Sequence, residues 1–141
     1  MNPTFKSLHL AHAAALDAYE REDLWPDGVR EALRALLGFL GAEPEHARTY
    51  LVELRYVPGG DQHLDAAREA FTSFLTPGHD ADPDLPLLTA ELITGGVLHL
   101  ITRHALEGRV AELPSTLAEL TCLVLAPYLP AEEVRQTVQR C

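Results

Sequence analysis

The side chains best suited to chemistry in this sequence are its seven histidines, because an imidazole can bind a metal or move a proton near neutral pH. His9 and His12 are three residues apart, which places both on one face of a helix. A closed zinc site needs four ligands, and no cysteine or carboxylate has a suitable spacing beside this pair. We therefore expect no metal, and we interpret the pair either as the lining of a pocket or as part of a solvated face.

The sequence holds no motif typical of an enzyme. It has neither a serine, histidine and acid in a catalytic order nor a glycine-rich loop that would hold a phosphate. If the chain were catalytic, His12 and Glu53 would be the acid–base pair. We expect a protein that is not an enzyme, with no catalytic residue and no cofactor.

His99, Thr94 and the Gly95–Gly96 pair share one strongly apolar stretch. An unpaired imidazole costs free energy in such surroundings, so His99 is either a core or interface histidine with a polar partner or a polar contact to a ligand. Thr94 either donates a hydrogen bond to a ligand or bonds to its own preceding carbonyl. Each glycine weakens a helix by about 1 kcal/mol relative to alanine. Close approach of a second copy, or room for a ligand, would explain that cost, and we favour the second copy.

Two apolar helices are predicted to hold these residues, one over 87–102 and one beginning at Leu113. Each has apolar residues on adjacent faces, and two such stripes on one helix indicate burial on two sides. Two helices from each of two copies would form a four-helix bundle closed by a two-fold axis. The residues expected in this dimer interface are Leu88, Leu92, Gly95, Gly96, His99, Leu117, Leu120 and Val124.

The rest of the chain also has helical periodicity, and alanine and leucine dominate its composition. Further helices are predicted over about 4–20, 29–40, 44–57, 61–75 and 130–140, with a loop at 76–83 and Asp84 as the cap of the next helix. The inward face of the first helix is predicted to carry Phe5, Leu8, His12, Leu16 and Tyr19. We expect an all-α bundle of six to seven helices that forms a single domain over residues 1–141.

The formal charge of −10, with Lys6 as the only lysine, argues against a surface that binds nucleic acid. No apolar run is long enough to cross a bilayer, so we expect no membrane partner. Two cysteines are too few for a disulfide framework, and no signal segment precedes the first helix, which favours the cytoplasm.

Three stretches of the sequence together have a recognisable pattern. Residues 42–53 follow an apolar helix that ends in Phe39 and Leu40, and residues 92–103 contain the glycine pair. Residues 112–114 are followed by the segments 123–129 and 131–133. These stretches resemble the sixth helix, the eighth helix and the junction of the ninth and tenth helices in the C-terminal regulatory domain of the tetracycline-repressor-like (TetR) family of bacterial transcription regulators.

This resemblance implies a homodimeric domain that binds a small-molecule effector. The family's DNA-reading helix-turn-helix has no counterpart here, so we expect DNA binding only if a longer protein supplies that part. The helix over 5–20 would then transmit effector binding to the DNA-reading head. Aromatic residues such as Phe74 are either plain core or part of the pocket. The residues expected to contact a small, largely apolar effector are His12, Leu33, Leu37, Tyr50, Phe71, Thr94 and Leu98. The alternative is a stand-alone acidic helical module that binds another protein and holds no ligand.

Overall fold

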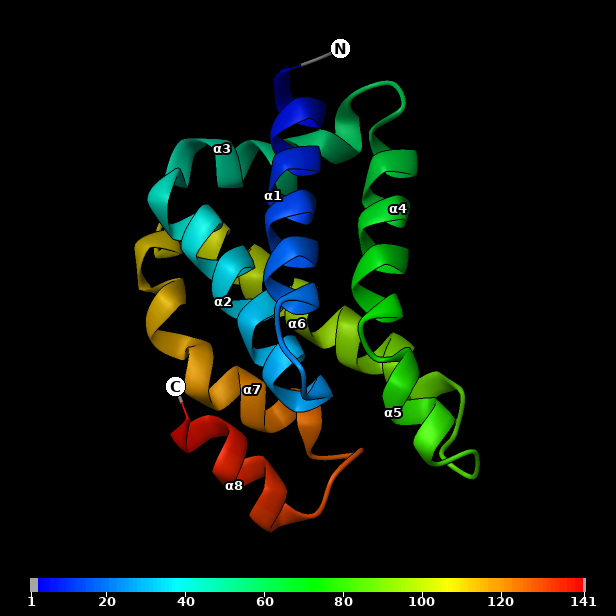
Figure 1. Cartoon of the computed structure of the whole chain (residues 1–141). Coiled ribbons are helices and arrows are strands. Elements are labelled where there is room, and N and C mark those ends of the chain that lie inside the picture. The colour runs from blue at the N-terminus through cyan, green and yellow to red at the C-terminus, as the bar shows by residue number, and fades with distance from the viewer. Residues whose placement is uncertain (1–2, 141) are drawn as a thin grey trace.

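The computed structural model describes residues 3–140, apart from the side chains of residues 3–5, 7, 46 and 50. Over that range the chain folds into eight α-helices joined by short π- and 3₁₀-helical segments and contains no strand (Figure 1). The predicted all-α class is confirmed, with more helices than expected. Among these residues, no helix combines the length and the apolar character that a membrane span requires.

The helices differ in length, and the longest ones surround the core. In chain order they are α1 (Pro3–Glu20), α2 (Trp25–Ala42), α3 (Pro44–Arg48), η1 (Thr49–Glu53), η2 (Leu54–Tyr56), α4 (Gly60–Ser73), α5 (Thr76–Ala81), α6 (Leu88–Leu106), η3 (Val110–Thr116), α7 (Leu117–Leu125) and α8 (Ala131–Gln139).

The centre of the fold is α2, which packs against α1, η3 and α7. Pro26 stands in its first turn, where the missing N–H costs nothing. Its buried face carries Val29, Leu33, Leu37 and Leu40, which are joined in the core by residues from α6 and α7. Figure 1 shows α1 upright in front of α2 and α6, with α4 beside it. These four helices therefore enclose the interior on several sides.

The face that α1 turns inward differs from the predicted one. Ala11 and Ala15 are buried, whereas Leu16 is exposed. Alanine has a short side chain, so this choice lets α1 lie close to α2. The inward row of α1 is thus Leu8, Ala11, His12 and Ala15, which has helical spacing.

The segment 76–83, predicted as a loop, instead contains α5 at Thr76–Ala81. Pro77 fits the first turn of this helix, so it starts the helix where we expected it to break the chain. Gly78 has no side chain because a Cβ atom there would lie 2.5 Å from Cδ1 of Tyr128 and 2.7 Å from Cη2 of Trp25. Contacts between distant parts of the chain therefore hold α5 in place. The predicted cap at Asp84 is also wrong, since α6 begins at Leu88.

Two hydrogen bonds tie the end of α4 to the junction of α1 and α2. The Trp25 Nε1–H donates to the carbonyl oxygen of Phe74 over 2.7 Å, and the Tyr19 hydroxyl donates to the same oxygen over 3.4 Å. Burial raises the pKa of the Tyr19 phenol, which keeps its proton available for this bond. The rings of Tyr19 and Phe74 also stack, with centroids 4.7 Å apart. The lower end of α4 is therefore fixed.

One buried hydroxyl group in the core lacks a partner. Thr121 on α7 is 0% exposed, and its Oγ1 atom makes no hydrogen bond within the described residues. Thr121→Val removes this group while keeping the shape, so we expect the free energy of unfolding to rise by about 1 kcal/mol. The midpoint of a urea titration measures the change.

Thr137 on α8 supplies the matched control, because it is also 0% exposed. Its hydroxyl donates to the carbonyl of Glu133 over 2.9 Å and accepts from Arg140 over 3.3 Å. Thr137→Val is therefore expected to lower the free energy of unfolding by about 1 kcal/mol. Equal losses in both variants would contradict the unpartnered state of Thr121.

Candidate ligand-binding site

An apolar cavity of about 90 Å³ lies between α1, α2, α4 and α6. Leucine, isoleucine, valine, alanine and phenylalanine side chains make nearly all of its wall. The lining residues are Leu8, Ala11, His12, Ala15, Leu36, Leu40, Leu51, Leu64, Ala67, Phe71, Phe74, Thr94, Val97, Leu98 and Ile101. Ligand sites typically combine such a wall with a few polar groups. The cavity is therefore the candidate site.

Among the side chains that the structure describes, two polar ones line the cavity, His12 and Thr94. The Oγ1 atom of Thr94 lies 2.9 Å from Oγ1 of Thr72, so the two hydroxyls bond to each other. Two hydroxyls carry two protons and this bond uses one, which leaves the other proton for a further acceptor. The threonine pair can therefore give one hydrogen bond to a molecule in the cavity.

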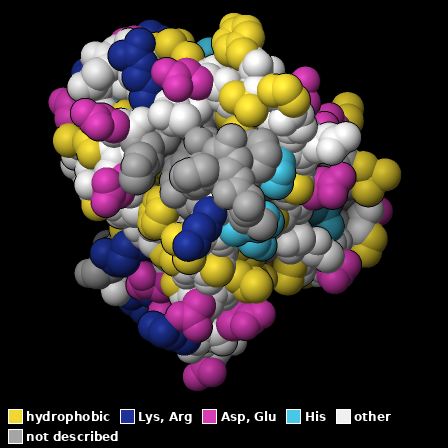
Figure 2. Space-filling model, turned by 90° about the horizontal axis from the view of Figure 1, so that it is seen from above, with side chains coloured by type: hydrophobic (Ala, Val, Ile, Leu, Met, Phe, Trp, Pro, Cys, Tyr) yellow, Lys and Arg dark blue, Asp and Glu magenta, His cyan; other side chains and the backbone are white. Residues whose placement is uncertain are grey.

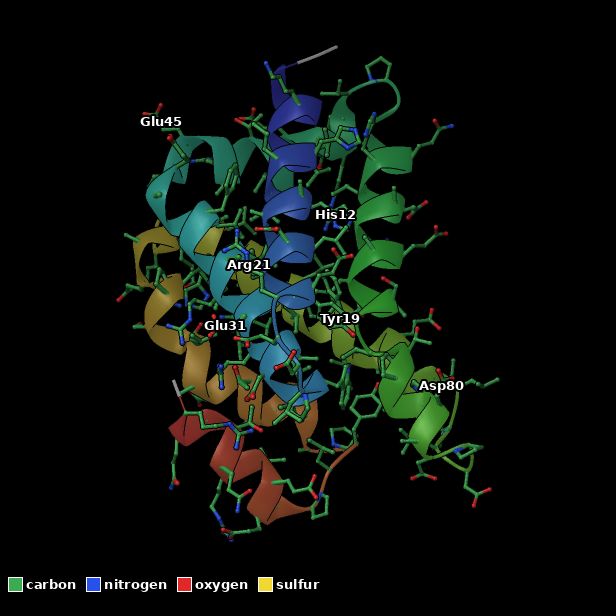
Figure 3. The ribbon with its side chains drawn as sticks, in the orientation of Figure 1. His12, Tyr19, Arg21, Glu31, Glu45 and Asp80 are labelled. Atoms are coloured by element: carbon green, nitrogen blue, oxygen red, sulfur yellow. The ribbon has the colours of Figure 1, made fainter. Side chains whose placement is uncertain are left out.

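His12 reaches the cavity from the other side. Figure 3 shows its side chain between α1 and α4. Its ring lies 6.3 Å from the ring of Phe74, and no hydrogen bond joins its nitrogen atoms to the other described side chains. The ring is only partly buried, so water can reach it. Its nitrogens are available to a ligand at the edge of the apolar space.

The structure brings together four of the seven residues predicted to contact an effector, namely His12, Phe71, Thr94 and Leu98. Leu33 and Leu37 are corrected, because both are fully buried in the main core and neither lines the cavity. Tyr50, the seventh, has a side chain outside the described part of the structure.

Sequence reasoning missed most of the α1 and α2 wall. Leu36 and Leu40, which form the neighbouring row on α2, line the cavity in place of Leu33 and Leu37. On α1 the missed residues are Ala11 and Ala15. Their helical spacing with His12 was a usable signal, but alanine is common on both buried and exposed faces of helices.

The structure offers little for a metal or for acid–base chemistry. No group of three or more histidine, cysteine, aspartate or glutamate side chains could hold a metal ion within residues 3–140. Glu53, paired with His12 in the catalytic alternative, is exposed and is not among the residues that line the cavity.

The residues predicted for a dimer interface fall into two groups. Leu88, Leu92, Gly95, Gly96 and His99 are all exposed along one side of α6. A Cβ atom added to either glycine would meet no other atom within 4 Å, so neither glycine is needed for packing inside the chain. His99 is exposed as well, so it is not a core histidine.

The α7 part of the predicted interface is corrected. Leu117, Leu120 and Val124 are buried in the chain's own core, where their side chains have no surface left for a second copy. The residues of α7 that face outward are Ala118, Glu119, Cys122 and Leu123. Comparison with models of protein families, with curated proteins and with solved structures finds no match for this chain.

Proposed function

We propose that this chain is the effector-binding and dimerisation domain of a TetR-like regulator, and that it holds a small, largely apolar molecule among α1, α2, α4 and α6. The observation that carries the proposal is the apolar cavity with His12 on one side and Thr94 on another. The TetR assignment itself rests on the sequence resemblance.

The position of α1 would allow a molecule in the cavity to change the position of this helix. Four α1 residues line the cavity, and in a complete regulator this helix would carry the DNA-reading head. A ligand shifts an equilibrium only by its difference in affinity for the two states. A molecule that fits one spacing of α1 and α4 better than another therefore favours one position of the head.

The exposed apolar residues of α6 and α7 support pairing with a second copy. Leu88, Leu92 and Leu123 are all more than half exposed. Burial of such side chains is worth about 1.5–3 kcal/mol each, and a two-fold axis repeats every contact. The glycines of α6 would let the backbone of a second copy come close. We therefore propose a homodimer that uses these outward faces.

Binding is tested by thermal shift and titration calorimetry with small apolar molecules on the unaltered protein. A ligand held by the folded state raises the melting temperature by mass action. Ala67→Leu fills part of the cavity from α4, so we expect affinity to fall by about tenfold or more while the fold remains. Ala13→Leu on the exposed side of α1 is the control and should leave affinity unchanged.

The small size of the cavity favours one alternative. Sites for drug-sized molecules usually enclose about 300–1,000 Å³, whereas this cavity has about 90 Å³. A helical module that binds another protein through its exposed leucines needs no ligand. If none of the apolar molecules raises the melting temperature, that result favours this module over the sensor.

A further inference from the structure

A second hollow adjoins the cavity and has a different character. It is a groove of about 190 Å³ between α1 and α4, and His9, His12 and His63 all line it. Leu8, His12 and Ala67 line both hollows, so the groove lies directly outside the apolar wall. Figure 2 shows histidine side chains gathered beside hydrophobic ones on this end of the molecule.

The side chains that line the groove differ in charge from the acidic composition of the chain. The sequence contains 21 aspartates and glutamates, yet none is among the described residues that line the groove. Three of the seven histidines line it, and the rings of His9 and His63 meet edge to face with centroids 5.8 Å apart. Each imidazole can donate at least one N–H, whereas a carboxylate can only accept. The groove is therefore suited to an anionic acceptor group.

We propose that the ligand is an amphiphile with a carboxylate head, whose apolar tail enters the cavity and whose head binds His9, His12 and His63. This inference rests on the proposed function, since it assigns a ligand class to the same cavity. His12 stands at the boundary between the two hollows and contacts both ends of the ligand. The hydroxyls of Thr72 and Thr94 lie deeper, where an unbranched tail leaves them hydrogen-bonded to each other.

The head group distinguishes a carboxylate amphiphile from an amine or an alcohol with the same tail. An ammonium head needs acceptors, and the groove lining offers no carboxylate. A hydroxyl head would form only neutral hydrogen bonds, which are about half as strong as those to a charged acceptor. The arrangement of three imidazoles around one groove therefore selects the acid over the amine and the alcohol.

The test compares octanoate, octan-1-ol and octylamine on the unaltered protein by titration calorimetry. The three share one tail and differ in the head, so no substitution is needed for the first result. We expect octanoate to bind about tenfold or more tightly than either of the others. Equal binding of the acid and the alcohol would overturn the assignment of the head while leaving the cavity proposal intact. Binding of none of the three would overturn this inference, and the broader screen of apolar molecules then decides the proposed function separately.

A double variant tests where the carboxylate head of the ligand binds. His9→Ala with His63→Ala removes two imidazoles that lie outside the cavity, so we expect octanoate affinity to fall about tenfold and octan-1-ol affinity to stay the same. Leu10→Ala with Gln62→Ala changes exposed residues of the same two helices outside the groove and should alter neither. Unchanged octanoate affinity in the histidine variant, with an unchanged circular dichroism spectrum, would overturn the proposed head site.

Discussion

Replacing Val124 by glutamate is expected to destabilise the folded chain severely. Val124 is 1% exposed and lies in the main core with Leu120 and Leu125. A carboxylate at this place loses its water and gains no partner, so we expect the free energy of unfolding to fall by at least about 4 kcal/mol. Domains of this size are stable by only about 5–15 kcal/mol. Circular dichroism along a urea titration measures the loss.

Leu123→Glu is the matched comparison, because Leu123 is the preceding residue of α7 and is 64% exposed. The same charge at this position stays in water, so stability should change by less than about 0.5 kcal/mol. If the outward face of α7 contacts a second copy, the variant is expected to sediment as a monomer. An unchanged dimer would contradict that interface, and a stable Val124→Glu chain would contradict the core described here.

These two neighbours show what periodicity can and cannot predict. The sequence places apolar residues on adjacent stripes of the α7 region, and burial on two sides is a sound expectation from that pattern. It does not say which stripe faces the chain's own core. In the structure Leu120, Val124 and Leu125 pack inward, whereas Ala118, Cys122 and Leu123 face out.

The same ambiguity limits prediction of the candidate site. All-α architecture and most helix positions follow from composition, spacing and the glycine and proline residues. On α2, however, Leu33 and Leu37 form one row and Leu36 and Leu40 form the next, and only the second row reaches the cavity. A rotation of α2 about its own axis by one residue position would bring the other row to the cavity. The packing of α1 against α2 sets that rotation. His12, Phe71 and Thr94 stand out chemically or in size on their own helices, whereas Leu98 is one of several leucines on α6.

The α5 helix shows the opposite case, in which distant contacts override a local signal. Pro77 and Gly78 indicate a turn when read along the chain. In the fold, the rings of Trp25 and Tyr128 occupy the space beside Gly78, and the Tyr128 hydroxyl lies 3.2 Å from Nε2 of His79. Residues about fifty positions away thus stabilise a short helix that its own sequence disfavours.

A buried arginine that sequence reasoning did not single out ties α2 to the C-terminal helix α8. Arg30 on α2 is 5% exposed. Its Nη1 atom donates to Oδ1 of Asp27 over 2.9 Å and to the carbonyl oxygen of Thr137 over 3.0 Å. Its other nitrogens donate to Glu31 over 3.1 and 3.3 Å. Arg140 also donates to Asp27 over 3.0 Å, so the carboxylate of Asp27 links α2 to α8.

Arg30→Ala is expected to lower the free energy of unfolding by about 3 kcal/mol. Removing one member of a buried ion pair usually costs about 3–5 kcal/mol, because the other member is left without its partner. The lower end applies here, since Arg140 still neutralises Asp27 and water reaches part of Glu31. Arg34→Ala is the control: its side chain is about half exposed and pairs with Glu31, so we expect a cost of less than about 1 kcal/mol.

Hydrogen exchange separates a local role of Arg30 from a general one. The carbonyl of Thr137 lies on α8, so loss of Arg30 should release that helix first and speed exchange of the amides of residues 131–139 more than those of α2. Arg30→Lys keeps the charge, but one ammonium group lacks the planar fork that reaches Asp27, Glu31 and Thr137 together, so we expect an intermediate effect. If Arg30→Ala cost no more than Arg34→Ala and left α8 protected, the apolar contacts of Val134 and the pair between Arg140 and Asp27 would be enough to hold that helix to the core.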